Sequence, residues 1–168
     1  MTAITTATLY SEPNTLTYDI LNTRSYITDP KDATGARTFV YDSEPFAKAV
    51  DFGKFPYIFL KLPVLDQEQN SADSKHHMLT YTQSIIVRTC RDGSGGSRTD
   101  SGKSNMKSIC DDMFETFNKA TVKQLYRTSQ LFKPILKLLN SDSGLINQKA
   151  IYETEFEISF ETRFKVSS

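Results

Sequence analysis

The stretch from Ile151 to Val166, IYETEFEISFETRFKV, decides the fold of this chain. Its even positions, from Tyr152 to Val166, are aromatic, aliphatic or threonine, whereas its odd positions, from Glu153 to Lys165, are charged or serine. A period of two that is kept over about eight pairs predicts a long β-strand with one buried and one exposed face. At roughly 3.3 Å per residue such a strand spans about 50 Å, so it either bends or ends against another chain.

A helical pattern precedes this strand in the chain. Apolar side chains recur between Met106 and Phe117 at the spacing of one helix face, and Ser104 is a candidate N-cap. The helix could continue past Asn118 into residues 122–131. We expect the apolar faces of the helix and the strand to form the core, with the following residues buried: Met106, Ile109, Met113, Phe114, Phe117, Phe156, Ile158 and Phe160.

Two further strands are predicted in the middle of the chain. Tyr57 to Leu60 is continuously apolar and lies between prolines, which is typical of a strand buried on both faces. Residues 79–90 alternate apolar and polar side chains. Because a polar loop over residues 66–77 joins the two runs, an antiparallel hairpin is the simplest topology.

The remaining segments are assigned from local signals. Residues 15–27 show a helical stripe that Asp29-Pro30 should end, and residues 140–144, NSDSG, have the composition of a turn. The segment from Lys133 to Leu139 could be a strand or a helix end. The predicted fold class is α+β, with an antiparallel sheet of about four strands and one major amphipathic helix on one face. We treat residues 1–168 as one domain, with a core over 55–166 and an N-terminal helix and arm over 1–54.

Composition narrows the classes of function. The chain has 168 residues and a mass of 19.0 kDa, and its 20 basic residues balance its 20 acidic residues. A formal net charge of zero argues against a nucleic-acid binder held by its overall charge. No apolar run approaches the roughly 20 residues of a membrane span, and the N-terminus lacks a signal-peptide pattern. The two cysteines, Cys90 and Cys110, are interpreted as free thiols.

No motif predicts catalysis, a cofactor or a metal site. The stretch that ends in Gly102-Lys103-Ser104 resembles a phosphate loop, but a P-loop needs its first glycine at position 97, which is Ser97, and the nearest glycine, Gly96, is one position too far from Gly102. The adjacent His76 and His77 would point to opposite sides of an extended segment, so they are poorly suited to share a metal ion.

Charge is segregated along this neutral chain. Residues 119–149 are basic, and the exposed face of the last strand is acidic. These two stripes could meet between copies of a homo-oligomer, or both could be solvated. The candidate interface residues are Glu153, Glu155, Glu157, Glu161, Lys123, Arg127, Lys133 and Lys137. Two loops, residues 66–77 and 91–104, are predicted to be flexible contact loops, with these candidate residues: Asp66, His76, Arg91, Arg98 and Lys103.

The layout resembles the tail terminator, or tail completion, proteins of long-tailed bacteriophages. The resemblance covers residues 55–166. It rests on the strand opening Phe55-Pro56-Tyr57-Ile58, the strand 81–89 after a polar loop, the helix with its Ile109 to Asn118 texture, and the closing aromatic strand. Residues 1–54 fit the family less well.

The resemblance implies a structural subunit rather than an enzyme, with no cofactor. Such proteins form a hexameric ring on the tail tube at the head-proximal end of the virion tail, after assembly in the host cytoplasm. The ring stops polymerisation of the tail tube protein, contacts the head-completion or connector protein, and lets DNA pass its lumen without specific binding. The glutamates of the last strand would face the lumen or a neighbour, and the lysines would pair with acids across the subunit boundary.

Three alternatives stay open. The chain could be another head–tail connector or neck protein, a small phosphate- or nucleotide-using enzyme built on the Gly102-Lys103-Ser104 turn, or a monomeric adaptor.

Overall fold

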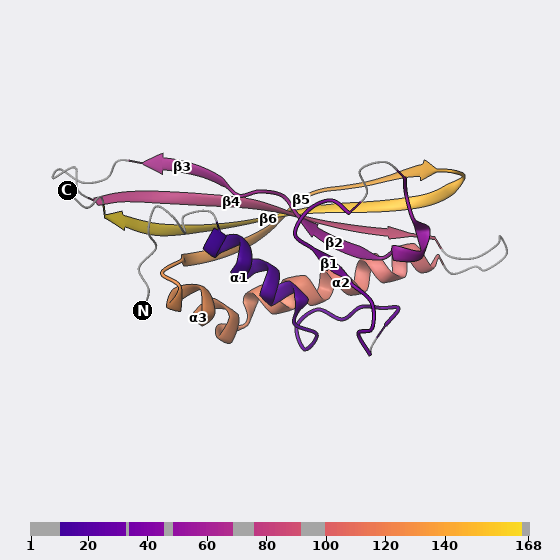
Figure 1. The fold of residues 1–168 in the computed structure, drawn as a ribbon, viewed down its shortest axis with the longest axis horizontal. Helices are drawn as coiled ribbons and strands as arrows, with labels where there is room; N and C mark the ends of the chain where they lie inside the picture. The colour runs from indigo at the N-terminus through magenta and orange to yellow at the C-terminus, as the bar shows by residue number, and fades with distance from the viewer. Residues whose placement is uncertain (1–10, 33, 46–48, 69–75, 92–99, 166–168) are drawn as a thin grey trace.

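A long twisted sheet with helices packed beneath it forms the body of the protein (Figure 1). The computed structural model describes residues 11–32, 34–45, 49–68, 76–91 and 100–165. The strands are β1 (Val40–Tyr41), β2 (Tyr57–Leu60), β3 (Val64–Glu68), β4 (His76–Cys90), β5 (Phe132–Ile146) and β6 (Lys149–Lys165). The helices are α1 (Ser11–Asn22), α2 (Ser101–Asn118) and α3 (Ala120–Thr128), with a short 3-10 turn at Phe52–Lys54. The fold class is α+β, as predicted.

The sheet differs from the predicted one because it has six described strands and is mixed. Its order is β1-β2-β4-β6-β5, and β3 also pairs with β4. The β1–β2 pair is parallel, while the other pairs are antiparallel. The expected antiparallel pairing of β2 with β4 is confirmed. The prediction missed β3 because its sequence, VLDQE, is short and polar and shows no clear period.

The alternation in the last strand is confirmed by burial. Phe156, Ile158 and Phe160 are buried on the helix side, whereas the glutamates between them are partly exposed on the opposite face. β4 and β6 pair without interruption from His76↔Lys165 to Cys90↔Ile151, so these two strands form the spine of the sheet.

The predicted turn at residues 140–144 is wrong, because this segment continues β5. The chain instead reverses at Asn147 and Gln148, which have φ angles of 48° and 65°. Two consecutive positive φ angles are typical of the tight turns that match the twist of paired strands. Cross-strand pairing with β6 therefore overrides the local turn preference of the serines, Asp142 and Gly144.

Three helices, rather than one major helix, form the layer beneath the sheet in the described residues (Figure 1). The predicted continuation past Asn118 is interrupted at Lys119, whose ψ of 134° is extended, so α3 begins as a separate helix. The cap of α2 is Asp100 rather than Ser104, because the Asp100 carboxylate accepts hydrogen bonds from the N–H groups of Gly102 and Lys103. α1 begins before the predicted segment and ends at Asn22.

The main core lies between the helices and the sheet. Of the predicted core residues, Ile109, Met113, Phe117, Phe156, Ile158 and Phe160 are buried. Met106 is partly buried. The prediction that Phe114 is buried is wrong, because 38% of this residue remains exposed. A second cluster, on the other face of the sheet, contains the following buried residues: Phe55, Tyr57, Phe59, Ile86, Cys90 and Ile151.

Candidate interaction surfaces

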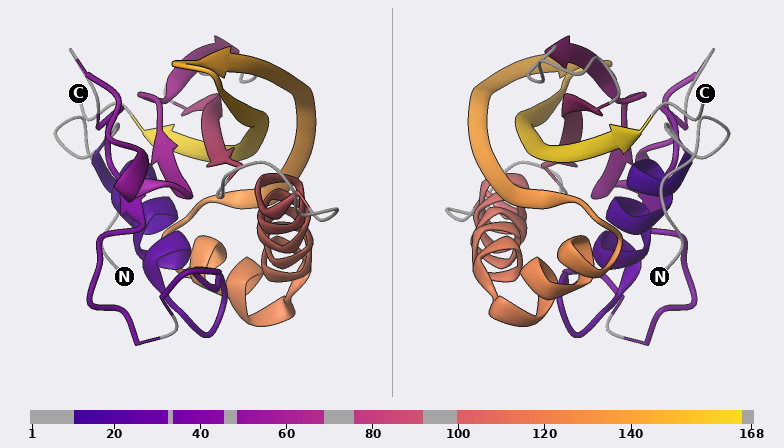
Figure 2. Two further views of the ribbon diagram at one scale, coloured as in Figure 1. Left: turned by 90° about the vertical axis from the view of Figure 1, so that its right-hand side faces the viewer. Right: turned by 90° about the vertical axis from the view of Figure 1, so that its left-hand side faces the viewer.

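β5 forms an edge of the sheet and is exposed along most of its 15 residues. It curves from the helix layer around the side of the molecule, and no described strand covers its outer side (Figure 2). Ile135, Leu138 and Leu139 are about half exposed there. An exposed edge strand offers unpaired backbone N–H and C=O groups to other chains. Soluble monomers therefore rarely leave an apolar edge strand exposed to solvent. We call the Ile135–Leu139 segment the β5 edge.

The opposite edge of the sheet also exposes apolar side chains. Leu62, between β2 and β3, is 83% exposed, and Val64 at the start of β3 is 60% exposed. β3 pairs with β4 on one side, and its other side has no partner among the described strands. We call Leu62 to Val64 the β3 edge.

The predicted glutamates gather on the sheet face that points away from the helices. Glu153, Glu155, Glu157 and Glu161 share this face because they alternate with the buried residues of β6. Register places Thr80, Thr82 and Ser84 of β4 beside them. The part of this face around Glu157 and Glu161 is therefore rich in hydroxyl and carboxylate groups, whereas the second cluster, with Phe59 and Ile86, covers the same face beside Glu155.

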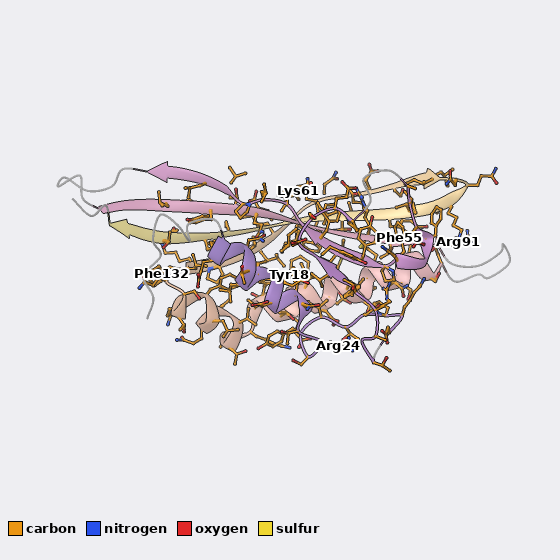
Figure 3. The ribbon with its side chains drawn as sticks, viewed as in Figure 1. Tyr18, Arg24, Phe55, Lys61, Arg91 and Phe132 are labelled. Carbon is orange, nitrogen blue, oxygen red and sulfur yellow. The ribbon has the colours of Figure 1, made fainter. Side chains whose placement is uncertain are left out.

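Cations of the same chain neutralise three of the four glutamates. Lys61 Nζ lies 3.1 Å from Glu155, on the side of the sheet away from the helices (Figure 3). Lys133 Nζ lies 3.0 Å from Glu161. Lys133 therefore pairs with an acid of its own chain, and its expected pairing with an acid across a subunit boundary stays a prediction. The pKa of Glu155 lies below its usual range because of hydrogen bonds from Ser84 and Lys61.

Arg88 organises the other half of this face. Its guanidinium binds the carboxylates of Glu153 and Glu44 and contacts the Tyr57 hydroxyl at 3.3 Å. Burial opposes the charge of Arg88, but these hydrogen bonds outweigh it and raise the arginine pKa. Burial also raises the pKa of Tyr57. Arg88 therefore links Glu153 on β6, another of the predicted glutamates, to Glu44 in the arm before β2.

Three of the four predicted basic residues lie around one hollow. A space of about 600 Å³ between α3 and the start of β5 is lined by Lys123, Arg127 and Lys133, with Leu131 and Phe132 contributing apolar surface. Phe132 marks its position in Figure 3. Lys137 does not line this hollow and lies further along β5. Glu161 also lines the hollow and pairs with Lys133, so Lys123 and Arg127 supply the surplus of positive charge that suits an anionic group of a partner.

The Gly102-Lys103-Ser104 segment does not form an open phosphate site. Asp100 already occupies the N-terminus of α2 and accepts a hydrogen bond from the Tyr152 hydroxyl. Burial opposes ionisation of Asp100, but hydrogen bonds from Tyr152 and from the N–H groups of Lys103 and Gly102 keep its pKa low. A Cβ at Gly102 would lie 2.7 Å from the Tyr152 ring. Because Gly102 has no side chain, the start of α2 can pack closely against Tyr152.

The predicted contact loops are shorter than expected where the structure describes them. Asp66 belongs to β3, His76 begins β4, and Lys103 lies in α2. Pairing with β4 extends the strands into the polar loop, and the Asp100 cap starts the helix earlier. The Arg91 N–H donates to the Ala150 carbonyl at 2.9 Å, so its backbone continues the pairing of β4 with β6. Arg98 and the centres of both loops lie outside the described residues.

Sequence reasoning missed the two apolar edges. In residues 133–139, apolar side chains occupy both parities, a pattern that is compatible with a strand or a helix end. A strand that is apolar on both faces is either buried or covered by a partner. The signal was therefore present, but the exposed position of the strand comes from the topology.

No group of three or more metal-binding side chains occurs among the described residues. Within the same residues, no helix is long and apolar enough to cross a membrane. Cys90 and Cys110 form no disulfide bond, as predicted. No protein-family model and no curated protein matches the sequence.

Proposed function

We propose that this protein is a tail terminator subunit of a long-tailed bacteriophage. In this proposal it forms a ring, hexameric in the family that it resembles, which caps the tail tube and joins it to the head. The observation that carries the proposal is the long β5 edge with its exposed apolar side chains. A monomer would leave this surface open to aggregation, whereas a subunit of an assembly covers it.

The hydrophilic face of the sheet supports the same proposal. A channel that passes DNA should not hold phosphates, because each neutralised phosphate adds to affinity. The glutamates of β6 and the hydroxyl groups of β4 give this face groups that do not attract phosphate strongly. Lys61 and Lys133 are neutralised there by ion pairs. We therefore assign this face to the lumen.

Other contacts of the ring are assigned to the ends of the molecule. The tip of the β5–β6 hairpin carries Leu145, which is exposed, and the opposite half carries the basic hollow of α3. The hairpin tip lies at one end of the long axis, and α3 lies in the opposite half of the molecule (Figure 1). We propose that one contacts the tail tube and the other contacts the head-completion protein.

The alternative of a nucleotide-using enzyme has weaker support, because Asp100 occupies the helix end that a phosphate would need. No observation favours a neck protein over a terminator.

The direct test is the mass of the purified protein by sedimentation, alone and after mixing with tail-tube protein. We expect a closed oligomer, or one that forms on the tube, and shorter tubes when the protein is added during polymerisation. A particle that keeps the mass of the 19.0 kDa chain in both conditions, with unchanged tube lengths, would contradict the proposal.

A further inference from the structure

One row of residues runs across the sheet from the β3 edge to the β5 edge. Val64 pairs with Thr82, Thr82 pairs with Ser159, and Ser159 pairs with Ile135. The two ends of the row are apolar and open, with Val64 60% exposed and Ile135 50% exposed. With strands spaced by about 4.8 Å, the ends lie roughly 14 Å apart on opposite edges.

A shared row has a consequence for assembly. A rotation about an axis parallel to the strands, without a rise, moves each residue to the same height on the next copy. It therefore brings one end of the row in one copy against the other end in its neighbour. We infer that, in the ring proposed above, the β5 edge of each subunit packs against the β3 edge of the next. This inference rests on the proposed function and specifies its subunit interface.

The charges of the two edges are complementary. Among residues 132–139 on β5, Lys133 is already paired with Glu161 of its own chain, which leaves Lys137 as the cation that can meet a neighbour, whereas the sequence of β3 holds Asp66 and Glu68 and no base. Lys137 forms no ion pair with the described residues, although it lies opposite Glu157 in the register. Opposite charges on the two edges favour contact between unlike edges over contact between two copies of the same edge.

The contact is made by side chains rather than by a continuous backbone ladder. Pro134 has no N–H group, and β5 is irregular between Phe132 and Ile135 and again between Leu138 and Asn140. Such features limit continuous backbone pairing along an edge strand, but they leave its exposed apolar side chains to be covered. Leu138 and Phe114 lie against Phe156 on the helix-facing side of the sheet, whereas Ile135 lies on the opposite side, so apolar side chains occupy both faces of this edge. Because side chains make the contact, the β5 edge should bind only a surface whose shape fits them.

Cross-linking tests which edges meet. Val64→Cys and Ile135→Cys proteins are prepared separately, and each is treated with a short bismaleimide alone and in a mixture. We expect a dimer on denaturing gels in the mixture and none with either protein alone. A dimer from Ile135→Cys alone would overturn the inference, because it would show that two β5 edges meet.

Assembly of charged variants separates this inference from the proposed function. Val64→Asp and Ile135→Asp should each weaken self-association at least about tenfold, because a carboxylate would be desolvated at the interface. Leu125→Asp, at a similarly exposed site on α3, is the control and should assemble normally. Normal melting temperatures would show that all variants fold. If the unmodified protein assembles and both edge variants do so equally well, the inference fails alone. If the unmodified protein assembles neither by itself nor on tail-tube protein, the proposed function fails too.

Discussion

Thr17 and Tyr126 are 109 residues apart in the chain, yet their hydroxyl oxygens lie 3.0 Å apart in the core. Thr17 Oγ1 also donates to the Pro13 carbonyl at 2.9 Å, so its single proton is used there and the Tyr126 hydroxyl donates to Thr17. Burial raises the pKa of Tyr126 and keeps this donor neutral. The pair joins α1 to α3 and therefore fixes the N-terminal helix onto the helix layer.

Thr17→Val should destabilise the protein by about 1–3 kcal/mol, because it leaves the buried Tyr126 hydroxyl without its acceptor. Adding Tyr126→Phe to this variant should cost little more, because the orphaned group is then absent. Urea unfolding of the two single variants and the double variant measures the coupling. Strictly additive losses would contradict the pairing.

Met113 and Phe114 are neighbours in α2 with opposite expected contributions to stability. Met113 is fully buried, so Met113→Ala should cost about 2–5 kcal/mol. Phe114 is partly exposed and packs one side of its ring on Phe156, so Phe114→Ala should cost about 1–2 kcal/mol. Urea unfolding under identical conditions gives both values. An equal or larger loss for Phe114→Ala would show that its ring is covered.

Asp32 should make stability depend on pH. Its carboxylate accepts hydrogen bonds from the Thr34 hydroxyl and from the N–H groups of Arg37, Gly35 and Thr34, which lower its pKa from the ordinary 3.8. A lowered pKa in the folded state contributes stability above the unfolded pKa and loses it as the pH falls. The difference in melting temperature between the unmodified protein and Asp32→Asn should therefore narrow between about pH 5 and about pH 2. If the difference in melting temperature stayed constant over this pH range, Asp32 would not be a source of the pH dependence.

Cys110 should react slowly with alkylating reagents. Burial raises the pKa of its thiol to about 11, with a smaller contribution from Asp111, so little thiolate is present at neutral pH. At about pH 8, its alkylation should be roughly 100-fold slower than that of a cysteine introduced at exposed Leu62. Peptide mass spectrometry separates the sites, including buried Cys90. Equal rates at Cys110 and the introduced cysteine would contradict the expectation.

The repeating patterns of the sequence were sufficient for the main strands and for α2. The alternation from Ile151 onward and the stripe from Met106 to Phe117 depend on local geometry, because a strand or helix presents the same face at a fixed period. The α+β class and the outward face of the β6 glutamates follow from these patterns alone. The clustering of Lys123, Arg127 and Lys133 around one hollow required α3 and β5 to be brought together.

Tertiary structure decided which surfaces are covered. β3 exists because β4 offers a partner, and residues 140–144 extend because β6 pairs with them despite their turn composition. Phe114 fits the apolar stripe, yet its ring contacts Phe156 and 38% of the residue remains exposed. The apolar residues of both edges were visible in the sequence, but their exposure depends on strand order. A local period specifies which face a side chain shares, whereas long-range pairing determines whether anything packs against that face.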